Sequence, residues 1–343
     1  MSRSYEGVPL LENQKPHEAY SREGHGFAKH IMDRRGANTF LIETVSSIVT
    51  FKSIYMGIED MSLKLMYITN DLDVALIAEK YGVERVWIDL ETLGKEERQA
   101  GLDAVKSHHT VDDIRKIKPH LTTSEMLVRV NHWYEGSEKE IEDVIAAGAD
   151  MVMLPYWKST DEVKSFIEAV DGRCQTTLLL ETKEAVECID EVLAMGGFDE
   201  IHIGLNDLHL SYGLDFMFEL LINGTVEMLC KKFKAAGIPY GFGGIAKIGD
   251  GAVPAEKIIL EHYRLGSTRA ILSRTFCDNA KIGSLEEINR VFAVNMKELR
   301  EYERFAASAP DYVYNKNREE LSKAVKKVAE VMHKKKHGEL QNA

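Results

Sequence analysis

Short apolar segments of strand type recur eight times between residues 63 and 272, and a helical pattern follows most of them. They begin near residues 63, 84, 126, 151, 177, 200, 239 and 268, so most starts lie roughly 20 to 30 residues apart, which is room for a strand, a turn and a helix. The segments are apolar almost throughout, which is typical of parallel strands buried on both faces. Eight such units predict an α/β protein with a (β/α)8 TIM barrel.

The competing fold is an open, doubly wound sheet. That fold does not require eightfold regularity, and no Gly-x-Gly-x-x-Gly fingerprint follows the first segment. We therefore expect a barrel domain over residues 61–305, preceded by an N-terminal arm over residues 1–60 and followed by a helical extension over residues 306–343. The extension has an amphipathic pattern over residues 318–332, which is expected to pack on its own barrel or on a neighbouring subunit.

Charge and composition argue against several classes of function. The formal net charge is −12, so a general nucleic-acid-binding surface is not expected. No apolar run approaches the ~20 residues that cross a bilayer. The four cysteines lie far apart and no signal peptide is recognised, which favours a reducing compartment over a disulfide framework. We expect a cytoplasmic protein that binds neither nucleic acid nor membrane.

Carboxylates follow two neighbouring predicted strands, at the end where such barrels hold their active sites. Glu181 ends one apolar run, and Asp207 follows the next one in a turn-forming Asn206-Asp207 pair. Each acid could instead cap the helix that comes after it. Acids crowded at one mouth repel one another unless a cation or a proton separates them, and Mg²⁺ uses one or two protein carboxylates. Glu181 and Asp207 therefore predict a site for Mg²⁺, or for Mn²⁺ or Co²⁺ in its place.

Arg129 belongs to the same ring of strand ends, together with Asp89 and Glu91. A guanidinium and a metal ion both oppose negative charge on oxygen, which is what a developing enolate needs. We expect Arg129 and Glu91 to act in catalysis and Asp89 in substrate binding. The alternative is a salt bridge from Arg129 to Asp89 or Glu91 that only holds the mouth together.

Five strand-end segments carry a family resemblance. They are Ile88-Asp-Leu-Glu91, Val128-Arg-Val-Asn131, Met153-Leu-Pro155, Leu180-Glu-Thr182 and Ile203-Gly-Leu-Asn-Asp-Leu208. In order and position this set, within residues 62–280, resembles the HpcH/HpaI aldolase and citrate lyase β-subunit family. That family has the barrel of the phosphoenolpyruvate/pyruvate-binding superfamily, and its members are commonly homo-oligomers.

The resemblance implies reversible carbon–carbon cleavage through a metal-bound enolate, giving pyruvate or an acetyl unit plus an aldehyde or keto acid. Glu181 and Asp207 match the metal ligands of the family, and Arg129 matches the arginine that holds the pyruvate or enolate oxygen. Backbone amides after the sixth strand would hold the substrate carboxylate. These amides belong to Gly204, Leu205 and Asn206.

The stretch after the second strand departs from the family pattern. Pyruvate aldolases of the family carry a histidine base directly after the acids of this strand, and Thr92 stands at that place. We expect the long loop that follows to compensate, with His108 or His109 as general acid or base. Lys95, Arg98 or Lys106 would bind an acidic group of the substrate. The competing interpretation is a solvated histidine pair before a helix.

These patterns predict a metal-dependent carbon–carbon lyase or aldolase that acts on a small-molecule 2-oxo acid, aldehyde or acyl substrate as a homo-oligomer. A second possibility is a phosphoenolpyruvate-using enzyme of the same superfamily, with phosphate bound near the Gly-rich turn at residues 241–244 and near Ser273 and Arg274. A third is a barrel without catalysis that serves as a binding subunit.

Overall fold

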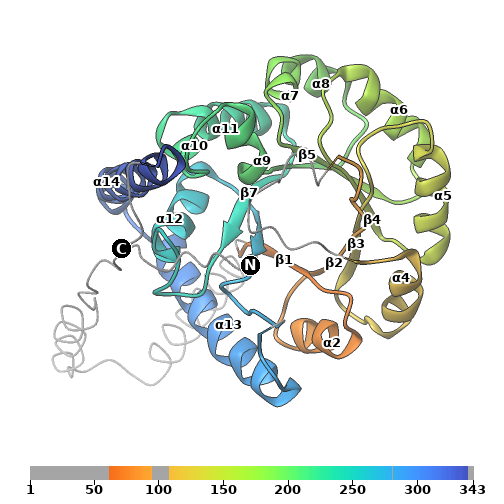
Figure 1. The fold of residues 1–343 in the computed structure, drawn as a ribbon, viewed down its shortest axis with the longest axis horizontal. Helices are drawn as coiled ribbons and strands as arrows, with labels where there is room; N and C mark the ends of the chain where they lie inside the picture. The colour runs from red at the N-terminus through yellow and green to blue at the C-terminus, as the bar shows by residue number, and fades with distance from the viewer. Residues whose placement is uncertain (1–61, 95–107, 280, 339–343) are drawn as a thin grey trace, which may run out of the picture. The chain divides into compact units, whose positions relative to one another are not determined.

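The computed structural model describes residues 62–94, 108–279 and 281–338. Its strands run parallel and close into a barrel, in which β8 pairs back with β1 (Figure 1). The strands are β1 (Lys64–Ile68), β2 (Arg85–Asp89), β3 (Glu125–Arg129), β4 (Met151–Leu154), β5 (Gln175–Leu180), β6 (Glu200–Ile203), β7 (Tyr240–Ile245) and β8 (Arg269–Leu272). The predicted (β/α)8 TIM barrel is confirmed. The arm expected at residues 1–60 lies outside the described residues.

Helices connect the strands and cover the outside of the barrel (Figure 1). They are α2 (Leu72–Lys80), α4 (Val111–Ile117), the 3₁₀ helix η2 (Lys118–His120), α5 (Ser137–Ala147), α6 (Thr160–Val170), α7 (Lys183–Glu187), α8 (Ile189–Met195), α9 (Leu205–Ser211), α10 (Glu219–Ile222), α11 (Thr225–Ala236), α12 (Ala255–Leu265), α13 (Leu285–Ala307) and α14 (Asp311–Lys336). Within the described ranges, no helix is both long and apolar enough to cross a membrane.

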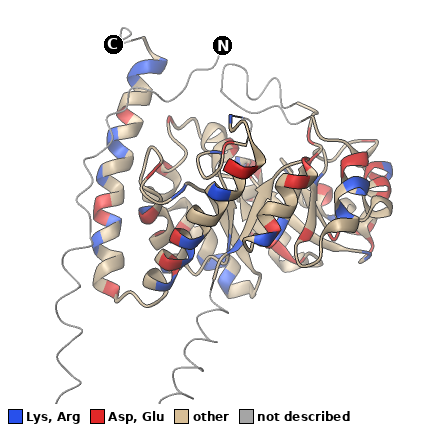
Figure 2. Cartoon of the chain, turned by 90° about the horizontal axis from the view of Figure 1, so that it is seen from below, with Lys and Arg blue, Asp and Glu red and all other residues tan. Residues whose placement is uncertain are grey.

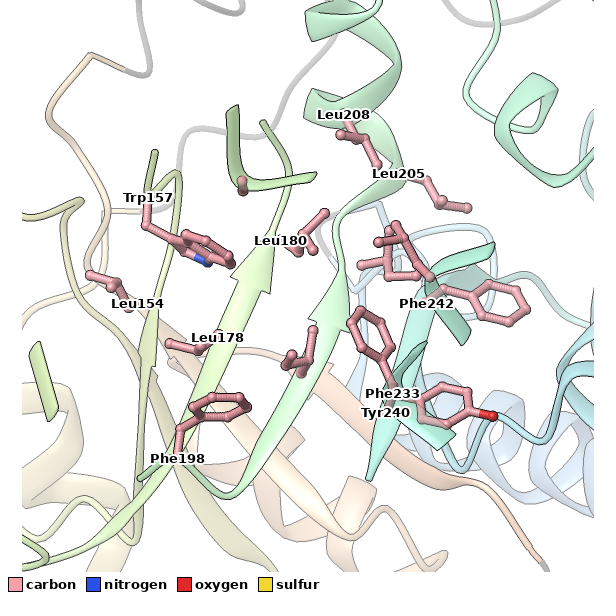
Figure 3. Packing of buried hydrophobic residues seen from close by; sticks show 14 of the residues in the cluster. Leu154, Trp157, Leu178, Leu180, Phe198, Leu205, Leu208, Phe233, Tyr240 and Phe242 are labelled. Carbon is pink, nitrogen blue, oxygen red and sulfur yellow. The ribbon is translucent and has the colours of Figure 1, made fainter. Parts of the chain in front are cut away.

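The apolar side chains form an inner and an outer layer, because successive residues of a strand point to opposite faces. The inner layer fills the barrel with Trp87, Leu127, Met153, Leu179 and their neighbours. The outer layer lies between strands and helices, and Figure 3 shows the part around β5 and β6. A strand buried on both faces has no polar side to expose, which is why these segments read as continuous apolar runs.

The segment after β6 differs from the prediction. Asn206 and Asp207 do not form a turn; they lie in the first turn of α9. Leu205 and Leu208 of this helix are buried in the outer core near Leu180 of β5 (Figure 3). The helix is thus held on the barrel rim by apolar packing, and Asp207 stands on a fixed element rather than on a loop.

An ionic cluster closes the opposite end of the barrel, where the strands begin. Arg85 of β2 donates to Glu200 of β6, with Nη2 3.1 Å from Oε2, and its Nε lies 2.7 Å from the Glu125 carboxylate. Arg269 of β8 also pairs with Glu200. Burial by itself would raise the pKa of the Glu200 carboxyl, but the two guanidinium groups outweigh it and hold the pKa below its ordinary value.

The two C-terminal helices pack on the barrel of the same chain. Helix α13 lies against α2 and α12, and α14 lies against α10 and α12. Leu321, Val325 and Val328 of α14 are buried, so the amphipathic face predicted over residues 318–332 meets its own barrel. Basic residues gather at the C-terminal end of α14 (Figure 2), where the helix dipole favours positive charge.

Candidate active site

Arg129 forms the centre of a charge cluster at the carboxyl ends of β2 and β3. Asp89 and Arg129 are register partners in these neighbouring strands. The guanidinium donates from Nε to Asp89 Oδ1 and from Nη2 to Asp89 Oδ2, both over 2.8 Å, and its Nη1 lies 3.3 Å from Glu91 Oε2. Both carboxylates are only 2% exposed. These ion pairs are the ones that the sequence offers as the alternative role of Arg129, and the bidentate pair with Asp89 fixes the plane of the guanidinium.

Among the described residues, the carboxylates of Asp89, Glu91 and Glu181 all act on the Arg129 guanidinium. Burial by itself would lower the pKa of Arg129, but the carboxylates of Asp89 and Glu91 outweigh it, and Glu181 acts in the same direction, so the pKa is raised. The ring of Trp87 also lies under the guanidinium, with 5.2 Å from Cζ to the ring centroid. Three carboxyl groups thus act on one guanidinium, and a bound cation would reduce the repulsion among them.

Glu181 is a buried carboxylate held in place by backbone. It directly follows β5 and is 3% exposed. The backbone N–H of Tyr156, after β4, donates to Glu181 Oε1 over 3.1 Å. Tyr156 has φ +50°, a left-handed conformation that costs a non-glycine residue energy and that is found preferentially at functional sites. Glu181 does not cap the next helix, because Thr182 does so by accepting from the N–H of Ala185.

Gly204 leaves the space that the Glu181 carboxylate occupies. A Cβ built on Gly204 would lie 2.7 Å from Glu181 Oε2 and 2.9 Å from Glu181 Cβ. Any side chain at this position would therefore displace the carboxylate. The β5 and β6 ends approach closely here, and the N–H of Gly204 donates to the carbonyl of Leu180 over 2.9 Å.

Glu181 and Asp207 follow neighbouring strands, and the half-buried Asp207 lies in the first turn of α9. Across the described part of the chain, no group of three or more His, Cys, Asp or Glu side chains is arranged to hold a metal. Glu181 and Asp207, the ligands predicted from the sequence, together offer two carboxylates. This fits Mg²⁺, which commonly binds one or two carboxylates and completes its shell with water and substrate.

Asn131 ties the loop after β2 to the end of β3, and the sequence analysis did not single it out as a positioning residue. Its Oδ1 accepts from the N–H groups of Thr92 and Leu93 over 2.8 and 2.9 Å, and its Nδ2 donates to Glu140 Oε1 over 2.8 Å. Ser137 and Glu140 have the spacing of a helix capping box, but Glu140 binds Asn131 instead. Nothing in a single sequence signals such a tertiary contact.

The structure describes only some of the site residues predicted on the long loop after β2. Lys95, Arg98 and Lys106 lie outside the described residues. His108 is exposed. His109 is half-buried, and its Nδ1 accepts a hydrogen bond from the backbone N–H of Asp89 over 3.0 Å. The structure therefore brings one of the two histidines to the Arg129 cluster.

The glycines of β7 are explained by packing. A Cβ on Gly241 would lie 2.4 Å from the carbonyl oxygen of Arg269, and one on Gly243 would lie 2.7 Å from Cδ1 of Leu205. Ser273 Oγ and Thr275 Oγ1 form a hydrogen bond with each other over 2.8 Å. Residues 241–244 thus lie within strand β7 and do not form the expected turn, and close packing accounts for Gly241 and Gly243.

A groove of about 790 Å³ lies at the other end of the barrel, below the starts of β3 to β6. Its walls include Glu125, Asp150, Thr176 and Asp199, all at or just before strand starts. Active sites of (β/α)8 barrels lie at the carboxyl ends of the strands, so the Arg129 mouth, and not this groove, is the candidate active site.

The chain is similar to one family model and to solved structures of low sequence identity. The family model described as HpcH/HpaI aldolase/citrate lyase matches residues 64–236. A solved HpcH/HpaI aldolase/citrate lyase family protein from Burkholderia cenocepacia J2315 is 14% identical, with a TM-score of 0.50, and the match covers 69% of this chain and 98% of that one. An HpcH/HpaI aldolase from Desulfitobacterium hafniense DCB-2 is 17% identical, with a TM-score of 0.49 and coverage of 71% and 95%.

A search of curated proteins finds no sequence that matches this chain. The solved structures share too little sequence to show more than the fold. The family model extends over half of the chain and spans β1 to α11, which includes Arg129, Glu181 and Asp207. The chain therefore belongs to the HpcH/HpaI aldolase/citrate lyase family, and its family and fold indicate an enzyme of the aldolase or lyase type.

Proposed function

We propose that this protein is a divalent-metal-dependent carbon–carbon lyase that cleaves, and in reverse joins, a 2-oxo acid or acyl unit and an aldehyde or keto acid. The observation that carries the proposal is the Arg129 guanidinium, fixed between the buried carboxylates of Asp89 and Glu91 at the mouth of the barrel. Glu181 lies on the same rim and acts electrostatically on Arg129. This arrangement suits an enolate, whose oxygen needs preorganised positive charge.

Glu181 and Asp207 would hold the cation, which we propose to be Mg²⁺, with Mn²⁺ or Co²⁺ as substitutes. A cation bound there supplies positive charge opposite the oxygen on which the enolate charge develops. Glu181 is prepared for this role because the Tyr156 N–H and the space at Gly204 fix its orientation before anything binds. Fixed outer contacts of this kind commonly tune metal affinity.

Arg129 would bind the enolate oxygen directly. A guanidinium carries five N–H donors, of which the Asp89 carboxylate takes two. Asp89 and Glu91 then act as positioning residues, since they hold the guanidinium plane and balance its charge. The backbone amides of Leu205 and Asn206 would hold the substrate carboxylate at the start of α9, where the first N–H groups of a helix lack intrahelical partners. The Gly204 amide, which the sequence predicts as a third donor, is not available because its N–H donates to the Leu180 carbonyl. Lys95 and Arg98 stay predicted contacts for a further acidic group.

A cleavage screen tests the proposed function. Aldol adducts of pyruvate (4-hydroxy-2-oxo acids) and 3-hydroxyacyl thioesters would be offered with Mg²⁺, Mn²⁺, Co²⁺ or EDTA, and pyruvate or the acyl product would be measured. We expect cleavage that requires a metal and that is lost in Glu181→Gln and Asp207→Asn. Glu168→Gln, at an exposed position on α6, is the matched control.

Cleavage that persists in EDTA would contradict the metal dependence. Metal binding without cleavage of either substrate class would favour a non-catalytic binding subunit. Release of phosphate from phosphoenolpyruvate would favour a phosphoenolpyruvate-using enzyme.

We also propose a homo-oligomer in the cytoplasm. Light scattering of the purified chain tests the oligomeric part.

A further inference from the structure

The hydrogen bond between Asp89 and His109 defines the chemical state of the His109 ring. A backbone N–H can only donate, so His109 Nδ1, 3.0 Å from the Asp89 nitrogen, must present its lone pair. A histidine nitrogen that accepts carries no proton, and the proton of the neutral ring is then on the other nitrogen. His109 is thus held as the neutral ring with its proton on Nε2.

The backbone on both sides of this contact is fixed. Thr110 directly after His109 is the N-cap of α4, where its N–H and hydroxyl both bind the Asp113 carboxylate, over 2.7 and 3.0 Å. Pairing of β1 with β2 ends at Ile68 and Trp87, two residues before Asp89. The Asp89 amide therefore lies beyond the last β1–β2 register pair, and the imidazole accepts its hydrogen bond. Protonation of Nδ1 would set two donors against each other and break this contact.

This state conflicts with a role as general base. A neutral imidazole accepts a proton only at the nitrogen that lacks one, and in His109 that nitrogen already binds the Asp89 amide. The same state is suited to donating a hydrogen bond, because a neutral imidazole with a fixed N–H can polarise a carbonyl without giving up its proton. Asp89 also positions Arg129 through its carboxylate, so one residue orients both side chains.

We infer that His109 is a neutral hydrogen-bond donor that acts through Nε2 on the carbonyl oxygen of the acceptor, and that it is not the base. This inference rests on the proposed function. When the enolate carbon bonds to the acceptor carbon, the carbonyl π electrons move to oxygen, and the Nε2–H hydrogen bond stabilises the alkoxide. The proton stays on Nε2, and the alcohol takes its proton from solvent, which received the proton that the methyl group lost when the enolate formed.

The tautomer can be measured without any substrate. The ¹⁵N resonances of histidine rings in the labelled full-length protein distinguish protonated from unprotonated ring nitrogens. The resonances of His109 are assigned as those that disappear in the His109→Gln variant. We expect Nε2 protonated and Nδ1 unprotonated near neutral pH. A proton on Nδ1, or on both nitrogens at neutral pH, overturns the inference even if the lyase activity is confirmed. The expected tautomer in a protein without lyase activity would leave the donor state intact and reject the proposed function instead.

Substitution of His109 tests the donor role in the reaction. The amide of Gln carries one acceptor and one donor, as the neutral ring does, whereas Ala provides neither. We expect His109→Ala to lower kcat about 10²–10³-fold with little change in KM, as for loss of one oxyanion donor. His109→Gln should recover most of this loss and keep the wild-type pH profile. His120→Gln, exposed at the far end of the barrel, is the control. A Gln variant as slow as Ala, with one limb of the pH profile gone, would instead show a base.

Discussion

Arg129 forms the ion pairs that join the ends of β2 and β3, and it is also the residue that we propose to bind the enolate oxygen. Its charge is permanent, and its two parallel bonds to Asp89 hold it in one plane at the rim. A lysine at this position would keep the charge but lose the fork that matches a carboxylate. Asp89 and Glu91 thus pair with Arg129, and Glu181 is the carboxylate that we propose for the cation.

At the same scale, Gly204 determines where the Glu181 carboxylate can lie. Gly204→Ala should lower Mn²⁺ affinity about 10–100-fold, the range seen when a contact that orients a metal ligand is lost. The cause would be displacement of Glu181, since an added Cβ would lie 2.7 Å from Oε2, while φ −80° at Gly204 suits any residue. Calorimetry measures the affinity.

The control for this variant is Gly283→Ala. A Cβ on Gly283 would have no atom within 4 Å, and its backbone needs no glycine. We expect it to bind Mn²⁺ as the wild type does. Equal affinity of Gly204→Ala and Gly283→Ala would show that Glu181 tolerates displacement or is not a ligand.

At the scale of elements, the mouth depends on cross-links between loops. The loop after β2 carries Glu91. The backbone N–H groups of the next two residues, Thr92 and Leu93, donate to the amide oxygen of Asn131, which follows β3. Glu140 of α5 holds the other end of this amide. Burial raises the pKa of the Glu140 carboxyl, and the Asn131 contacts oppose that rise. A strand, a loop and a helix are thus joined through one side chain.

Asn131→Asp should weaken this link. The aspartate keeps an acceptor for the two loop N–H groups but loses the Nδ2 donor and sets a second carboxylate against Glu140. We expect the free energy of unfolding to fall by about 1–3 kcal/mol, the cost of a buried polar group without its partner. The double variant Asn131→Asp with Glu140→Gln should recover part of the loss, because the Gln amide can donate to the new carboxylate. Urea unfolding of the four proteins measures the coupling, and a double variant no more stable than Asn131→Asp contradicts it.

Elements were predictable where local pattern and burial agree. The eight strands are buried on both faces, so their apolar runs could be found without knowing their partners. The first turn of α9 was predicted as a turn because Asn206 and Asp207 favour one, and only the burial of Leu205 and Leu208 on the barrel reverses that preference.

The contacts of the candidate site also include some that the sequence predicts and some that it does not. Residues at strand ends, such as Arg129 and Asp89, could be predicted to meet because parallel strands end at one rim. Contacts made by the backbone could not be predicted, because every residue except proline carries the same N–H group whatever its side chain. The Tyr156 amide on Glu181 and the Asp89 amide on His109 are of this kind.

At the scale of the whole molecule, the two ends of the barrel use charge differently. At the strand starts, Glu200 is enclosed by Arg85 and Arg269, so the cluster is satisfied within the protein. At the strand ends, three carboxylates of the described residues act on the single guanidinium of Arg129. The first end therefore serves stability, and the second is suited to binding a cation.

Glu200→Gln should destabilise the fold by about 3–5 kcal/mol, because removal of one partner leaves the buried guanidinium groups without their counter-charge. The folded-state pKa of Glu200 is below its ordinary value of 4.5. The ionised carboxylate therefore stabilises the folded state at pH values above the unfolded-state pKa, and this stabilisation is lost as the pH falls through the folded-state pKa. Denaturant unfolding at several pH values checks this. The stability difference between wild type and variant should shrink below about pH 4.5, and a difference that does not change with pH would contradict it.

The central claim is that this mouth stabilises an enolate with Arg129 and a cation held by Glu181 and Asp207. Exchange of the methyl protons of pyruvate for deuterium, or of the acetyl protons of a thioester, tests it without knowledge of the acceptor. Proton NMR in D₂O should show exchange in the wild type with Mg²⁺ or Mn²⁺, and loss of exchange in EDTA, in Arg129→Lys and in Glu181→Gln. Folded protein with no exchange of either compound under any of these metals, or with equal exchange in the variants, would contradict the claim.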